Sequence, residues 1–218
     1  MICPGVVAAA PYPAIAPTLT MKLSVLHRLM WVAAFLPGLS TPVVAQVRLE
    51  GQSFVSELRL ADTELRLNGV GLRAVAWLKG YAAGLYLVQR TNSSSQAISA
   101  PGPKRLQLRM LQEVGAVEFV KAFDKGVTRN TPEAELPRLR ERMAVFEERV
   151  QSLGTVRKGD VVDLDWLPGV GMHFSVNGTL KGAPIPGEDF YGALLKIFVG
   201  DKPVDAELKV GLLGGPPR

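Results

Sequence analysis

The chain has 218 residues, of which 47% are hydrophobic and 21% are charged, and its formal net charge is +5. This composition is typical of a globular protein long enough to bury a sizeable core, which excludes disorder for most of the chain. The basic residues are scattered among Asp and Glu rather than gathered in a stripe with aromatic residues, so we expect no nucleic-acid partner.

The N-terminal segment is typical of an export signal. Residues 1–20 look like a translated upstream stretch, and Met21 is the better start. A basic segment that includes Lys22 follows, then an apolar run at 29–36, then small side chains ending at Ala45. We expect a signal peptide at 21–45, cleavage after Ala45 and a periplasmic or secreted protein; a retained N-terminal anchor is the alternative.

Cleavage would leave a mature chain with one histidine and no cysteine. Cys3 and His27 would both be removed, and no second apolar run of about 20 residues occurs later, so we expect no membrane span after cleavage. A cysteine nucleophile, a disulfide and a cysteine zinc site are then excluded, and we expect no cofactor or metal. A catalytic triad would need His173, but its alternating run predicts a strand and the chain has no G-x-S-x-G motif.

The first half of the predicted domain consists of strands and turns. Alternation of apolar and polar residues predicts strands at 54–60, 63–67, 71–78 and 81–88. The turns between them are predicted at Ala61-Asp62, Asn68-Gly69 and Lys79-Gly80. These strands suit a half-buried antiparallel sheet.

Helical periodicity begins after a polar loop at 91–103 and a strand at 106–111. Apolar residues three or four apart predict a first helix, with the stripe Val117, Val120, Phe123 and Val127. A second helix of about 20 residues is predicted with Thr131 as N-cap and Pro132 at its first position, ending at Gly154.

The last third returns to strands and then to helices. Strands are predicted at 161–166 and 172–176, followed by a hairpin turn at Asn177-Gly178. Two further helical segments follow, one containing Phe190 and a short one at 205–213. We therefore predict one α+β domain over 46–218, an antiparallel sheet with helices on one face.

Two neighbouring segments contain the candidate site. In 67–73 (LNGVGLR) a strand-like run follows the glycines where a phosphate loop would need a helix, so we predict a tight strand connection that places Arg73 at the start of the next strand. The glycines would allow unusual backbone angles or close approach. Tyr81 then lies on one face of the following strand, which would line an apolar cleft. Arg73 and Tyr81 would together hold a carboxylate or phenolate, unless Arg73 is a surface residue and Tyr81 ordinary core.

These segments resemble the chalcone isomerase superfamily, in particular its bacterial chalcone-isomerase-like branch. The resemblance covers nearly all of 50–214 and rests on LNGVGLR, on GYAAGLYL, and on further matches at 123–130, 169–171, 177–178, 189–195 and 200–204. It implies an open-faced β-sandwich, a large antiparallel sheet with layered helices and a ligand cleft between them.

The resemblance also implies roles for individual residues. In plant-type chalcone isomerases an Arg in the G-x-G-x-R segment attracts the substrate's phenolate, and Arg73 matches it. Their Thr, Tyr and Asn positions are occupied here by Tyr81, Phe123 and Asn130, so two hydroxyl positions are altered or lost. Phe123 has no donor for the enolate oxygen that develops during cyclisation. Fatty-acid-binding members are similar in using an Arg and a Tyr at the positions of Arg73 and Tyr81.

We therefore expect a noncatalytic, exported protein that binds a fatty acid or another apolar carboxylate through Arg73, Tyr81, Phe123 and Asn130. Two alternatives stay open. One is an intramolecular lyase of the chalcone–flavanone isomerase type, acting on a phenolic ligand through Arg73, Tyr81 and Asn130. The other is a structural or interaction protein of the cell envelope.

Overall fold

The computed structural model describes residues 45–216. The predicted upstream stretch and nearly all of the predicted signal peptide lie outside the described residues. Every helix and strand discussed below belongs to 45–216.

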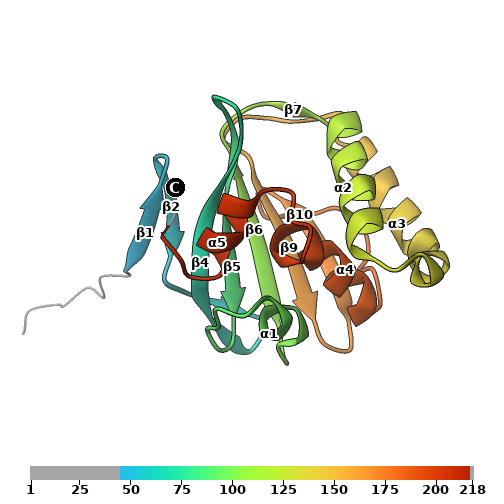
Figure 1. The fold of residues 1–218 in the computed structure, drawn as a ribbon, viewed down its shortest axis with the longest axis horizontal. Coiled ribbons are helices and arrows are strands. Elements are labelled where there is room, and N and C mark those ends of the chain that lie inside the picture. Colours follow the sequence, from blue (N-terminus) through green and yellow to red (C-terminus); the bar gives the residue numbers. More distant parts are fainter. Residues whose placement is uncertain (1–44, 217–218) are drawn as a thin grey trace, which may run out of the picture. The chain divides into compact units, whose positions relative to one another are not determined.

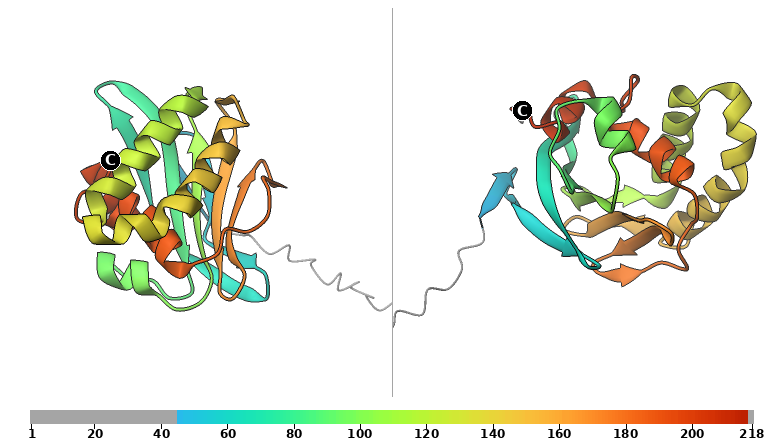
Figure 2. Two further views of the ribbon diagram at one scale, coloured as in Figure 1. Left: turned by 90° about the vertical axis from the view of Figure 1, so that its right-hand side faces the viewer. Right: turned by 90° about the horizontal axis from the view of Figure 1, so that it is seen from below.

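One curled antiparallel sheet forms the centre of the fold, and helices gather on one side of it (Figures 1 and 2). Its seven strands follow the order β11-β10-β9-β6-β5-β4-β3. Their bounds are β3 Glu57–Leu60, β4 Thr63–Val75, β5 Leu78–Leu87, β6 Lys104–Met110, β9 Val161–Leu167, β10 Gly171–Val176 and β11 Thr179–Leu180. The predicted α+β class is confirmed.

Two small sheets and five α-helices complete the described part of the chain. The small sheets pair β1 (Gln46–Leu49) with β2 (Gln52–Val55) and β7 (Val114–Gly115) with β8 (Thr155–Val156). The helices are α1 Ser94–Ser99, α2 Ala116–Asn130, α3 Leu136–Gln151, α4 Glu188–Val199 and α5 Ala206–Leu212, with a 3-10 turn η1 at Glu133–Glu135. None of these helices is long and apolar enough to cross a membrane.

The sheet separates two apolar clusters because its side chains alternate between faces. The inner face, toward the helices, carries the larger cluster, with Leu106 and Leu108 of β6 fully buried. The outer face carries a smaller cluster around Phe54 of β2 and Tyr86 of β5. On β6 the outer positions that alternate with these leucines are polar, beginning with Arg105.

The predicted turn at Asn68-Gly69 is wrong, because β4 runs through it with a shift of register between Leu67 and Gly69. Asn68 is 1% exposed, and its side chain donates to Leu212 O at 2.7 Å and accepts from Thr91 N at 2.7 Å. A tertiary contact therefore uses the polar side chain that suggested a local turn. Arg73 consequently lies near the end of β4 and does not begin a new strand.

The predicted turn at Lys79-Gly80 is also wrong. The β4–β5 hairpin turns at Ala76 and Trp77, between the paired residues Val75 and Leu78. Ala76 adopts a φ of +52°, a left-handed conformation that glycine usually supplies. The sequence lacks that glycine signal, so local reasoning placed the turn too late.

Two helix boundaries differ from the prediction for local reasons. The second long helix begins at Leu136, after η1, and not at Thr131. Pro137 explains this start, because proline is tolerated in the first turn of a helix but breaks its interior. Within the predicted loop at 91–103, Ser93 accepts a hydrogen bond from Gln96 N and caps the short helix α1.

Candidate ligand-binding site

Close contact between α5 and β4 positions the site. A Cβ atom on Gly71 would lie 2.5 Å from Leu208 O of α5, and one on Gly69 would collide with the backbone at Gly211. The prediction that these glycines allow close approach is confirmed. The close approach brings Asp205, the N-cap of α5, beside Arg73 near the end of β4.

Arg73 and Tyr81 face each other across β4 and β5, so their side chains share the inner face. Nη1 of Arg73 donates to Ala74 O at 2.7 Å and to Asp205 Oδ2 at 3.2 Å. The side chains of Arg73 and Asp205 are only 23% and 14% exposed, so this ion pair is partly shielded from water. Nε and Nη2 of Arg73 have no partner within 45–216.

Asp205 is a residue that the sequence analysis missed. Its Oδ1 accepts from Glu207 N at 2.9 Å and from Leu208 N at 3.1 Å, which caps α5, while Oδ2 binds Arg73. An aspartate directly before a helical run is a recognisable N-cap. Its second contact, to a residue 132 positions away, is set by the fold and has no local signal.

Tyr81 retains a neutral hydroxyl without a partner among the described residues. Burial raises the pKa of its phenol well above the usual value; the Arg73 charge acts in the opposite direction and the Asp205 charge adds to the rise. The phenol therefore stays protonated at physiological pH. It can donate one hydrogen bond.

A cavity of about 380 Å³ lies between the β4–β5 hairpin and helices α2, α3 and α4. Its polar side chains are Arg73, Tyr81 and Glu118, and its apolar lining is Val75, Leu78, Leu108, Val114, Phe119, Ala122, Phe123, Phe146, Leu164, Leu194, Ile197, Phe198 and Val204. Val75 and Leu78 are 60% and 52% exposed, whereas Phe146 and Leu164 are each 3% exposed. The cavity thus extends from the hairpin tip into the core.

The structure brings three of the four predicted ligand residues to this cavity. Arg73, Tyr81 and Phe123 line it, and the Phe123 ring lies 4.7 Å from that of Phe146. Asn130 does not line it. Its amide donates to Gly126 O and Lys202 O and accepts from Lys202 N, each at 2.9 Å, so it connects the end of α2 to the segment after α4.

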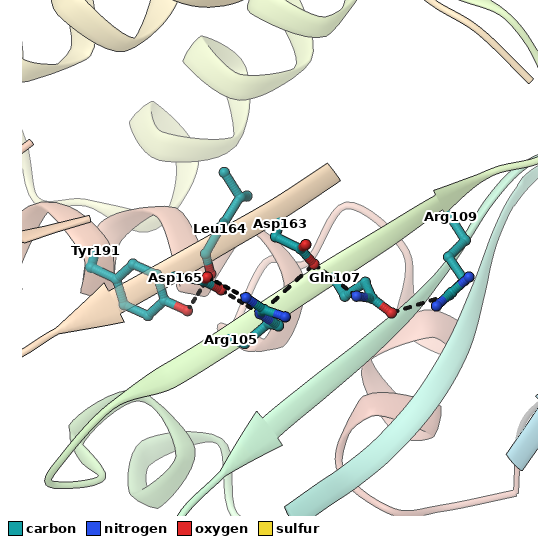
Figure 3. A network of polar contacts seen from close by, with 7 residues as sticks. All are labelled: Arg105, Gln107, Arg109, Asp163, Leu164, Asp165 and Tyr191. Atoms are coloured by element: carbon teal, nitrogen blue, oxygen red, sulfur yellow. Dashed lines mark hydrogen bonds and ion pairs between the residues drawn. The ribbon is translucent and has the colours of Figure 1, made fainter. Parts of the chain in front are cut away.

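The outer face holds a separate polar network (Figure 3). Arg105 donates to Asp165 through Nε at 2.6 Å and through Nη2 at 2.5 Å. Gln107 donates to Asp163 at 2.8 Å and accepts from Arg109 at 3.1 Å. His173 pairs in register with Asp165 and so belongs to this face, away from the cavity. No group of three potential metal ligands occurs within 45–216.

Comparison with known proteins identifies the family to which the chain belongs. A family model for chalcone isomerase-like proteins matches residues 46–214, and the chain belongs to that family. The fold resembles the crystal structure of a fatty-acid binding protein from Arabidopsis thaliana with a TM-score of 0.63. The two share 17% sequence identity over 78% of this chain and 96% of that one, so the likeness shows a common fold. No curated protein matches the chain by sequence.

Proposed function

We propose that this protein is exported and binds a fatty acid or a similar apolar carboxylate in the 380 Å³ cavity without converting it. The observation that carries the proposal is the set of unused donors at the cavity. Nε and Nη2 of Arg73 and the hydroxyl of Tyr81 lack partners within 45–216, and both residues line a mostly apolar space in which Glu118 is the third polar side chain.

The donor set suits a carboxylate. A guanidinium presents two parallel N–H groups that match the two oxygens of a carboxylate, and the neutral Tyr81 phenol adds a third donor. Asp205 already neutralises part of the Arg73 charge, since it binds Nη1 at 3.2 Å. We therefore expect the head group to contribute orientation and moderate affinity.

The apolar lining suits the rest of such a ligand. Cavities of about 300–1,000 Å³ with a few convergent polar groups are typical of small-molecule sites. Burial of hydrocarbon stabilises a complex by about 25 cal/mol per Å², so the tail supplies much of the affinity. The shared fold with a fatty-acid binding protein supports this ligand class.

The geometry favours binding over cyclisation. A lyase of the chalcone isomerase type must stabilise an enolate oxygen with donors placed where that charge develops. Phe123 has no donor, and the Asn130 amide is bonded to Gly126 and Lys202. His173 lies on the outer face and supplies no base to the cavity.

Export is supported by the signal pattern that ends at Ala45 and by the family match, which begins at residue 46. Cell fractionation and N-terminal sequencing would test it. A mature protein that begins at Gln46 and is recovered from the periplasm or the medium is the expected result. Recovery of the intact chain from the cytoplasm would contradict it.

Lipids extracted from the purified protein and identified by mass spectrometry would test ligand binding, followed by calorimetric titration with fatty acids. Arg73→Ala should weaken binding about 10- to 100-fold, because a charge-assisted hydrogen bond is lost. Arg66→Ala, on the same strand but exposed and paired with Glu57, is the matched control and should bind like wild type. A wild-type protein that takes up no acid would refute the proposal, as would chalcone cyclisation faster than the spontaneous reaction.

A further inference from the structure

A wall of three side chains closes the buried part of the cavity. Phe119, Phe146 and Leu164 line the cavity and also line a second void of about 10 Å³ behind it. Phe174 lines that second void and does not line the cavity. A space of this size is at or below the minimum for one water molecule, so the wall separates the cavity from a small apolar gap.

Phe146 is the central part of this wall. It belongs to α3 and is 3% exposed. Its ring centroid lies 4.7 Å from that of Phe123, which lines the cavity, and 5.3 Å from that of Phe174, which lines the void. The ring therefore stands between the two spaces.

We propose that Phe146 limits the length of the acyl chain and that the cavity selects medium-chain acids of about ten carbons. The inference rests on the proposed function. A methylene group occupies nearly the same share of liquid volume as a water molecule, about 30 Å³, so a cavity of about 380 Å³ holds about 12 non-hydrogen groups. The carboxylate occupies three of these, which leaves space for a tail of about nine carbons.

Removal of the Phe146 ring would join the cavity to the void behind it. Protein interiors relax only partly around a deleted side chain, so most of the added space should remain open to a ligand. We expect Phe146→Ala to raise the preferred chain length by about two to four carbons. Phe146→Leu should shift the preference in the same direction by less, and it retains more packing.

The test is a titration of saturated fatty acids from hexanoate to stearate against the full-length protein and its variants. Wild type should bind decanoate at least about tenfold more tightly than palmitate. Phe146→Ala should raise the affinity for palmitate relative to decanoate by about tenfold. The affinity ratio within one variant does not depend on the fraction of protein that is folded.

Phe174→Ala is the matched control. It also deletes a buried aromatic ring beside the void, so it should lose thermal stability to a similar extent, but it leaves the wall in place. Its palmitate-to-decanoate ratio should stay within about twofold of wild type. Phe146→Leu and Phe174→Leu repeat the comparison if either alanine variant fails to fold.

The results separate the two proposals. A wild-type protein that binds no acid of any length would overturn both. A wild type that binds acids but prefers palmitate or longer chains would overturn the length limit alone. Equal ratios for the Phe146 and Phe174 variants would show that Phe146 is not the wall, and the proposed function would stand.

Discussion

The two faces of the sheet carry the same kinds of polar side chain in different settings. On the outer face, Arg105 gives two nitrogens to Asp165 in a bidentate ion pair. On the inner face, Arg73 gives only Nη1 to Asp205 and lies beside a cavity of about 380 Å³. Both donors of the outer arginine bond to an aspartate, whereas Nε and Nη2 of the inner one have no partner within 45–216.

The tyrosines of β5 repeat this contrast. Tyr86 on the outer face is fully buried in the Phe54 cluster, and its hydroxyl has no partner in the part of the chain that the structure describes. Tyr81 on the inner face lacks a partner as well, but it lines the cavity. An unpaired hydroxyl thus costs stability where packing encloses it and indicates a binding site where free volume adjoins it.

The largest expected effect comes from breaking the outer network. Asp165→Ala would leave Arg105, in a mostly buried position, with only its 3.8 Å contact to Asp163, and should lower the free energy of unfolding by about 3 kcal/mol. Urea denaturation would measure this loss. Asp62→Ala, which breaks a fully solvated contact with Arg59, should give no measurable change. Equal stability of the two variants would show that the outer network contributes little.

The second-largest expected effect is a loss of folding stability at high pH, caused by the buried tyrosines. Burial raises the pKa of Tyr86 from 10.0 to about 12, partly opposed by Arg109 and Arg105, so the folded state keeps its phenol proton longer than the unfolded state. This contribution to stability is complete below pH 10 and is lost as the pH rises toward 12. Urea midpoints from pH 8 to about 11 should fall above pH 10, and less steeply in Tyr86→Phe. Parallel curves for both proteins would contradict the assignment.

Tyr81→Phe tests the inner face with the smallest possible change. Loss of one neutral donor should weaken fatty-acid binding by about 1 kcal/mol, roughly fivefold, and should leave thermal stability close to that of wild type. Calorimetric titration and thermal denaturation measure the two quantities. Unchanged affinity would mean that the Tyr81 hydroxyl does not contact the ligand.

Tyr86→Phe is the same substitution on the other face, and the smallest effect is expected of it. Removal of a buried hydroxyl without a partner should leave the free energy of unfolding at neutral pH unchanged or raise it by up to about 1 kcal/mol. Fatty-acid affinity should equal that of wild type. A clear loss of stability would indicate that the hydroxyl is bonded to an ordered water.

Local sequence patterns predicted much of this fold and part of the site. Alternation predicted most of the sheet, and the Asn177-Gly178 hairpin is confirmed by the pairing of Val176 with Thr179, whereas the turns predicted at Asn68-Gly69 and Lys79-Gly80 are wrong. Arg73 and Tyr81 were predicted to share a cavity, and both line one, because register and alternation place them on the same face.

Several differences from the prediction arise where distant parts of the chain meet. Asn68 was assigned to a turn, but its amide bonds to Leu212 and Thr91. Asn130 was predicted to contact the ligand; it does not line the cavity, and its amide bonds to Lys202. Asp205 was not assigned at all, since its contact with Arg73 depends on how closely α5 approaches the glycines of β4. Such partners are set by tertiary contact, which the pattern of neighbouring residues does not encode.

The two edge strands of the sheet bear on the tendency of the protein to aggregate. One edge strand, β11, has only two residues, and the other, β3, has four, with the charged side chains of Glu57 and Arg59 exposed on it. Long, flat, apolar edges act as templates for strand pairing between molecules and so promote aggregation. Short and charged edges offer a poor template, so we expect a curled sheet with such edges to resist fibril formation even though it is open at both sides.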